Sequence, residues 1–158
     1  MHLQPSYYFN SESGTGTGNT AFEYGVNAII IMPMMRIYAM ENNIMSLFFQ
    51  FGVGWGQAYG TIHESTDQTD FTGSSLGYQG GLGLAICYMK THCLNLEANL
   101  RVLDIERNIS DKSTVAQHSV ASALITQSGA GKEVEISDKD LGVNLTGVQI
   151  LAGYVFRY

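Results

Sequence analysis

Charged and polar residues with shared spacing suggest where chemistry is possible. Glu97 and Arg101 lie four positions apart in a segment that alternates between apolar and polar residues. A strand places alternate residues on opposite faces, so these two side chains share a face. Arg157 has the matching position in the last segment, and Arg36 is a further candidate. The pattern predicts either an internal ion-pair network or a polar lining for solute passage. The predicted set is Gln50, Gln79, Asn95, Glu97, Asn99, Arg101 and Arg157.

The two cysteines fall on the same predicted face. Cys87 and Cys93 are six positions apart and flank a short turn. If the hairpin pairs these two positions, a disulfide can form in an oxidising compartment. Two free, buried thiols are the alternative. The spacing is not that of a zinc site, and we expect no metal and no cofactor.

The histidines offer little catalytic signal. Gln117-His118-Ser119 faintly resembles the His and Ser of lipid A deacylase barrels, but the spacing differs and the residues fall in a predicted loop. We therefore predict no catalytic residues and interpret His118 as a solvated loop residue. His63 beside Glu64 and Asp67 is interpreted as part of a hydrophilic loop rather than as a metal site.

Four segments that carry or adjoin these residues alternate with a period of two. In each, one face is large and apolar, and the other is small or polar. A soluble barrel keeps its bulky residues inside, where these aromatic and leucine side chains would overfill a small interior. With the apolar face toward lipid, glycine suits a narrow lumen. The segments are 45–60, 74–89, 93–102 and 147–158.

Composition agrees with a membrane-spanning barrel. The 158 residues suit a single domain, 1–158, and only 14% are charged, against about 25% in typical soluble domains. The alternating runs reach the about 9–11 residues that a spanning strand needs, whereas none reaches the roughly 20 apolar residues of a spanning helix. The net charge of −6, without a basic cluster, argues against nucleic-acid binding.

Aromatic residues gather near the ends of the alternating segments. Trp55 and Tyr59 lie toward one side and four others toward the opposite side. Two such groups match the aromatic girdles of membrane barrels. The predicted lipid-interface aromatics are Trp55, Tyr59, Tyr88, Tyr154, Phe156 and Tyr158.

The segment 33–60 resembles small outer-membrane β-barrel proteins of the Bacteroidota porin-like type. It has a Pro-x-x-Arg-x-Tyr element, then a short turn, a Ser-Leu-Phe run and Gly-Val-Gly-Trp-Gly. The Gly-Leu-Gly-Leu run at 81–84 and Leu-Asn-Leu-Glu at 94–97 are similar to the family's next hairpin. The final residues, ILAGYVFRY, resemble the C-terminal signal read by the outer-membrane assembly machinery. The resemblance covers most of 19–158.

The resemblance implies an antiparallel up-and-down transmembrane β-barrel in the outer membrane of a Gram-negative bacterium. Its fold is typically eight-stranded, just wide enough for side chains to fill, which favours the internal network over a solute path. Because fewer strands are recognised here, we expect that the chain lacks the first hairpin and the signal peptide. The alternative is that 109–139 supplies two strands. About six strands are predicted: 1–9, 21–40, 44–61, 74–89, 93–107 and 141–158.

Long and short connections alternate, which predicts extracellular loops at about 11–20, 62–72 and 109–139. The expected partners are outer-membrane lipids, the assembly machinery through the strand 147–158, and an unidentified extracellular ligand; we expect a monomer. The predicted function is a non-enzymatic structural or surface-interaction role, with a filled lumen or at most a narrow pore. A soluble β-barrel that binds a small apolar ligand is the alternative. An outer-membrane lipid-modifying enzyme is the third hypothesis.

Overall fold

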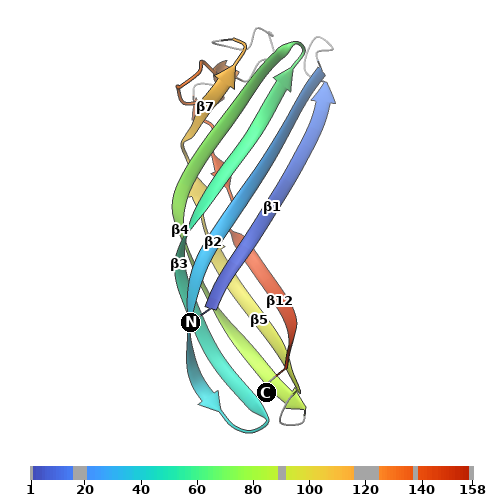
Figure 1. Ribbon diagram of the computed structural model, residues 1–158, viewed down its shortest axis with the longest axis vertical. Helices are drawn as coiled ribbons and strands as arrows, with labels where there is room; N and C mark the ends of the chain where they lie inside the picture. The colour runs from blue at the N-terminus through green and yellow to red at the C-terminus, as the bar shows by residue number, and fades with distance from the viewer. Residues whose placement is uncertain (1, 16–20, 89–91, 116–124, 137–138, 157–158) are drawn as a thin grey trace.

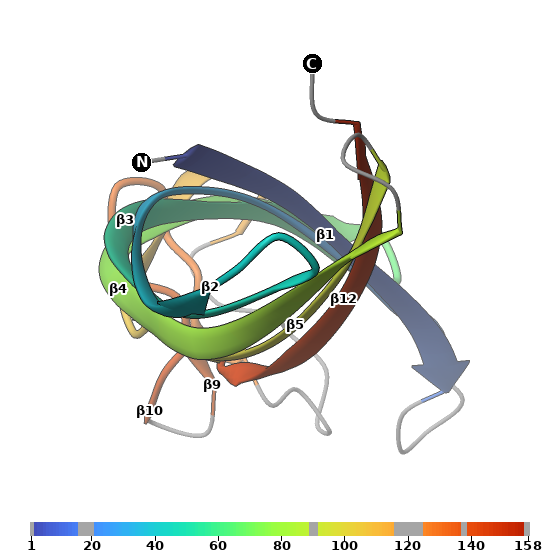
Figure 2. The same ribbon diagram turned by 90° about the horizontal axis from the view of Figure 1, so that it is seen from below.

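The computed structural model describes residues 2–15, 21–88, 92–115, 125–136 and 139–156. Within them, six antiparallel strands form a curled sheet with the shape of half a barrel (Figure 1, Figure 2). The predicted all-β, antiparallel, barrel-like architecture is confirmed, and β1 and β12 form the two edges of the sheet. In sheet order, the strands are β1 (His2–Thr15), β2 (Ala21–Glu41), β3 (Met45–Glu64), β4 (Asp67–Tyr88), β5 (His92–Val102) and β12 (Gly147–Phe156).

The hairpin of β3 and β4 is longer than predicted. Residues 62–72 were predicted as a loop, but they belong to the two strands, which continue to a tight turn at Ser65–Thr66. Ser65 has a φ of 58°, a value that tight hairpin turns require. The polar composition of 62–72 concealed a continuing alternation, in which Ile62 and Phe71 are buried.

The other two predicted loops also contain strands. β1 reaches Thr15, so residues 11–15 pair with β2, and 16–20 lie outside the described part of the chain. The predicted loop 109–139 contains most of β7 (Asn108–Ser113), which joins the main sheet beside the first half of β4. A separate small sheet follows, formed by β8 (Ile125–Gln127), β9 (Glu135–Ile136) and β10 (Lys139–Asp140).

The predicted strands 93–107 and 141–158 are each divided in two. β5 ends at Val102, and β6 (Asp104–Ile105) pairs instead with β11 (Val143–Asn144). Between β11 and β12, the Thr146 amide donates a 2.8 Å hydrogen bond to the Asn144 side chain. This turn explains why the apolar positions change parity between β11 and β12.

The two faces of the sheet differ in polarity. The convex face carries large apolar side chains that are exposed, whereas many side chains of the concave face are buried. We call the end with the Ser65–Thr66 turn the upper end and the end with the 42–44 turn the lower end, as they stand in Figure 1. The concave face is polar toward the lower end and apolar toward the upper end.

Glycines on β3 and β4 make room for large side chains inside the curl. A Cβ at Gly56 would lie 2.6 Å from Leu103, and one at Gly77 would lie 2.9 Å from the same side chain. A Cβ at Gly83 would collide with the ring of Phe48. The glycine-rich face is therefore the crowded face of the sheet.

Candidate functional site

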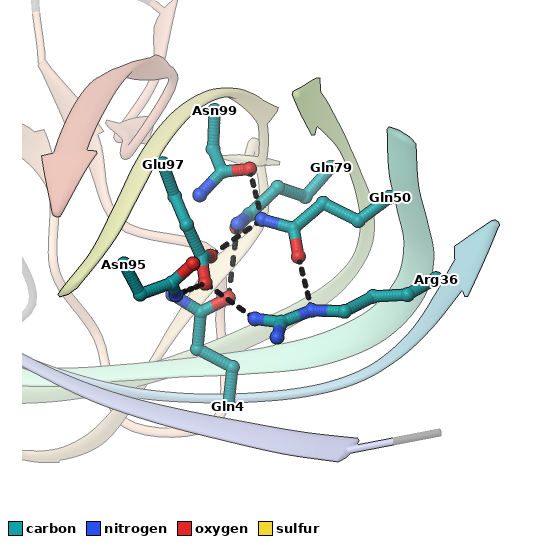
Figure 3. A network of polar contacts seen from close by, with 7 residues as sticks. All are labelled: Gln4, Arg36, Gln50, Gln79, Asn95, Glu97 and Asn99. Carbon is teal, nitrogen blue, oxygen red and sulfur yellow. Dashed lines mark hydrogen bonds and ion pairs between the residues drawn. The ribbon is translucent and has the colours of Figure 1, made fainter. Parts of the chain in front are cut away.

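Polar side chains from five adjacent strands, β1 to β5, meet at the lower end of the concave face (Figure 3). Glu97 is 7% exposed and forms an ion pair with Arg36. Around this pair lie amide side chains, so the charges are neutralised and solvated by protein groups in place of water. We call this group the polar cluster; its members are Gln4, Arg36, Gln50, Gln79, Asn95, Glu97 and Asn99.

Hydrogen bonds connect the members of the polar cluster. Gln50 Nε2 donates to Glu97 Oε2 at 2.7 Å and to Asn99 Oδ1 at 2.6 Å. Arg36 Nε donates to Gln50 Oε1 at 3.0 Å, and Asn95 Nδ2 donates to Glu97 Oε1. Each of the two charged groups thus has more than one partner, which is the condition under which a buried pair is tolerated.

The register of β4 allows β3 and β5 side chains to meet. Gly81 pairs with Gln50 on one side and with Asn99 on the other, so no side chain separates the two amides. Gly83, the next residue on this face, leaves room for the ring of Phe48. The Arg36 guanidinium lies 4.4 Å from the centroid of that ring, within cation–π range.

Most of the predicted polar residues belong to the polar cluster. Arg101 does something else, since its Nε donates to the Leu145 backbone carbonyl at 3.0 Å. Arg157 lies outside the described residues. Arg36 supplies the positive charge, and Gln4, which accepts a 3.1 Å hydrogen bond from Gln79, was missed. The inward position of Gln4 on the first strand was the feature of the sequence that could have identified it. The members that were predicted are Gln50, Gln79, Asn95, Glu97 and Asn99.

Apolar residues form a cluster at the upper end of the concave face. Side chains of β3 and β4 pack there against residues from the segment that follows β7. We call this group the upper apolar cluster; its buried members are Ile62, Phe71, Ile125 and Val134. A second apolar group lies beneath it and comprises Ala28, Ile30, Met32, Met34, Ala58, Leu103, Ile105 and Leu145.

Backbone hydrogen bonds hold the segment after β7 against the main sheet. Ser110 N donates to Lys132 O at 2.9 Å, and Val134 N donates to Asn108 O at 2.8 Å. The chain from 131 to 134 therefore lies beside β7 and extends the wall of the half-barrel. This arrangement brings Val134 into the upper apolar cluster.

The predicted lipid-interface aromatics lie on the convex face where the structure describes them. Trp55, Tyr59, Tyr88 and Tyr154 are all exposed, Tyr88 to 77%. The Phe156 side chain and Tyr158 lie outside the described residues. The convex face therefore combines exposed aromatic residues with an exposed aliphatic surface.

Cys87 and Cys93 occupy opposite positions in the β4–β5 hairpin and form a disulfide. Both residues are buried on the concave side. Of the two alternatives left open by the sequence, the structure contains the bridge. It ties the lower end of β4 to β5, one pair away from Tyr88 and His92.

The other candidate residues are not assembled into a site. Gln117, His118 and Ser119 lie outside the described residues. His63 and Glu64 lie at the end of β3, where His63 is exposed and Glu64 is buried. In the part of the chain that the structure describes, no group of three or more His, Cys, Asp or Glu side chains is arranged to hold a metal ion.

Comparisons with protein-family models, curated proteins and solved structures find no match to this chain. The described residues contain no helix that is long and apolar enough to cross a membrane. The described side chains form a buried polar cluster on the concave face and an apolar surface on the convex face.

Proposed function

We propose that this chain is an integral β-barrel protein of a Gram-negative outer membrane, with a structural or surface-interaction role and no enzymatic activity. The observation that carries the proposal is the reversed distribution of polarity across the sheet. Soluble proteins rarely expose large contiguous apolar patches, whereas the outer face of a membrane barrel contacts lipid and its interior is polar. On β3, the exposed apolar residues are Phe49, Phe51, Val53, Trp55 and Tyr59.

The spacing of the aromatic residues supports this reading. Trp55 pairs with Leu76 of β4, and Leu76 precedes Tyr88 by twelve positions. At about 3.3 Å per residue, this distance is roughly 40 Å along the strand. A strand tilted by about 45° would then cross about 28 Å of membrane, which is close to the thickness of the hydrocarbon layer, about 30 Å.

The polar cluster supports a lumen that is filled by side chains. Its ion pair is neutral overall, and its amides bridge β3 and β5 across the inside of the curl. Small barrels have an interior just wide enough for such filling. The disulfide agrees with an oxidising compartment such as the periplasm. We therefore expect no stable open channel in planar bilayers; openings of fixed conductance would contradict a filled lumen.

The proposed partners follow from this location. Outer-membrane lipids contact the convex face, and the assembly machinery reads the last strand, 147–158. The upper end, which carries the long segment after β7, faces outward and meets an extracellular ligand. We expect the barrel to be a monomer.

Two substitutions on the same face of β3 test the membrane proposal. Phe49 lies midway between the two aromatic groups, and its partner is Leu82. In lipid, Phe49→Lys lowers the free energy of unfolding by about 2–4 kcal/mol, the cost of a lysine at the bilayer midplane. The control is His63→Lys near the upper turn, whose expected effect is within about 0.5 kcal/mol. Urea unfolding in phospholipid vesicles, followed by the fluorescence of the single tryptophan, measures both.

The same experiment separates the alternatives. A chain that folds in buffer without detergent or lipid, and that tolerates Phe49→Lys, would be the soluble ligand-binding barrel instead. The lipid-modifying enzyme is tested by the mass of lipid A from cells that express the chain. We expect an unchanged mass, and a new acylation state would contradict the non-enzymatic role.

A further inference from the structure

A cavity of about 390 Å³ opens at the upper end of the concave face. It lies between the β1–β2 hairpin on one side and residues 141–145 on the other. Val26, Ile62, Phe71 and Leu141 contribute to its apolar wall. Its volume is within the range of about 300–1,000 Å³ that small-molecule sites occupy. At roughly 30 Å³ for each water-sized group, it accommodates about a dozen methylene-sized groups.

The polar groups of the cavity are few and uncharged. Tyr8, Asn10 and Tyr24 line it, and the Tyr24 hydroxyl donates a 2.7 Å hydrogen bond to the Glu12 carboxylate. Of the residues described around the cavity, none is Lys, Arg, His, Asp or Glu. A charged ligand would lose its hydration there without a compensating partner, which is costly. Glu12, beside Tyr24, additionally disfavours an anion.

We infer that the cavity binds a neutral amphiphile with one medium-length aliphatic chain and a single hydroxyl group. The apolar wall contacts the aliphatic chain of the ligand. Tyr8, Asn10 or Tyr24 donates a hydrogen bond to the ligand hydroxyl or accepts one from it. A phospholipid is disfavoured, because none of the residues described around the cavity carries a charge that would pair with its headgroup. The cavity is a property of the fold, so this inference does not depend on the membrane location proposed above.

Photolabelling of the full-length folded chain tests the inference. The probe is dodecanol that carries a diazirine in its chain, and fragmentation mass spectrometry locates the labelled residues. We expect labels on cavity residues within 21–41 and 125–145. Excess dodecanol lowers this labelling roughly tenfold, and the same probe with a carboxylate in place of the hydroxyl labels roughly tenfold less.

Two glycine substitutions provide a matched pair. Gly142 lines the cavity, and a Cβ there has no neighbour within 4 Å, so Gly142→Leu adds a side chain at the edge of the cavity without a backbone clash. Gly25 has the same freedom but lies on the opposite face of β2 from Tyr24 and Val26. We expect Gly142→Leu to lower the labelling roughly tenfold and Gly25→Leu to leave it unchanged. The urea midpoint verifies that each variant folds, and Val26→Phe replaces Gly142→Leu if that variant does not.

Three outcomes would overturn the inference. Labels confined to convex-face residues would mean that the probe meets only the outer surface. Interior labels that resist both excess dodecanol and the filling variant would mean non-specific reaction. A diazirine phospholipid that labels the same interior residues would mean that the cavity is open to bilayer lipid and does not hold a free amphiphile.

Discussion

At the lower end of the concave face, hydrogen-bonded polar side chains fill the interior, whereas at the upper end an apolar cluster lines it and buried polar residues lie beside that cluster. The polar cluster comes from strands that are neighbours in one continuous sheet, β1 to β5. The upper apolar cluster receives Ile125 and Val134 from a segment outside that strand order. Glycines are closely covered at both ends, for example Gly83 by Phe48 and Gly60 by Phe71, but only the upper end of the described chain has the apolar cavity beside Tyr24.

The two ends are therefore stabilised by different kinds of interaction. The polar cluster depends on the pairing of its two charges, because an unpartnered buried charge costs several kcal/mol. The upper apolar cluster and the apolar group beneath it depend on filled volume, because apolar contacts have no directional requirement. Substitutions at the two ends should therefore differ in how they can be compensated.

The largest expected effect is that of Glu97→Ala. Without the carboxylate, Arg36 stays half-buried and unpaired, and Gln50 loses an acceptor. We expect the free energy of unfolding to fall by about 3–5 kcal/mol. Urea unfolding in vesicles, followed by tryptophan fluorescence, measures the change.

The control for Glu97→Ala removes both charges. In Arg36→Met/Glu97→Leu no charge is left without a partner, and the stability should return to within about 1 kcal/mol of the parent or exceed it. A double variant as unstable as Glu97→Ala would show that the polar cluster depends on its specific hydrogen bonds rather than on charge compensation.

Leu103→Ala should have the next largest effect. Leu103 is 1% exposed, and its side chain fills the space left by Gly56 and Gly77. Its truncation creates a cavity in the apolar group and should cost about 3 kcal/mol. Leu100→Ala, a leucine exposed on the convex face, is the matched control; it leaves no cavity in the interior, so its expected cost is smaller than that of Leu103→Ala. Equal losses of stability for Leu103→Ala and Leu100→Ala would mean that the interior relaxes into the space that the Leu103 side chain leaves.

A larger side chain should destabilise the protein at a crowded glycine position and be tolerated at an open one. Gly83→Leu places a side chain against the buried ring of Phe48, which should cost about 1–3 kcal/mol. Gly142→Leu enters open space and should change the stability by less than about 0.5 kcal/mol. The ratio of the two costs, from unfolding midpoints, measures how much more crowded the surroundings of Gly83 are than those of Gly142. Equal losses of stability for Gly83→Leu and Gly142→Leu would mean that Gly83 is no more crowded than Gly142.

The smallest effect is expected for the disulfide at the lower end. Replacing both Cys87 and Cys93 with Ser should lower the stability by at most about 2 kcal/mol, because the bridge closes a loop with a sequence separation of only 6. Unfolding with and without reductant measures the effect. An alkylating reagent added without reductant should leave the mass of the parent chain unchanged; addition of two labels would mean free thiols.

Much of the polar cluster was predictable, because strand alternation is a local property. Five of its members were identified from their parity, and Arg36 was named as a further candidate, although the faces of its segment are not cleanly separated in the sequence. Gln4 was missed because the first strand offered too short an alternating run before its polar end. The role of Arg101 was not predictable, since its acceptor, the Leu145 carbonyl, belongs to a turn far along the chain.

The upper end was the least predictable part of the molecule. Residues 62–72 and 109–139 are polar on average, and this composition indicated loops, although Ile62, Phe71 and Val134 are buried. A strand in such a region is held by backbone hydrogen bonds to its neighbour, and those bonds do not depend on the side chains. Pairing of β7 with β4 therefore leaves little trace in the sequence.

Alternation along the chain was sufficient to define the two faces, the main hairpins and the shared face of the two cysteines, because each follows from the geometry of a single strand or turn. The curl of the sheet, the convergence of five strands in the polar cluster and the apolar cavity beside Tyr8 required the folded chain. These features depend on distances between residues that are far apart in sequence, and such distances are decided by sheet register and twist rather than by local composition.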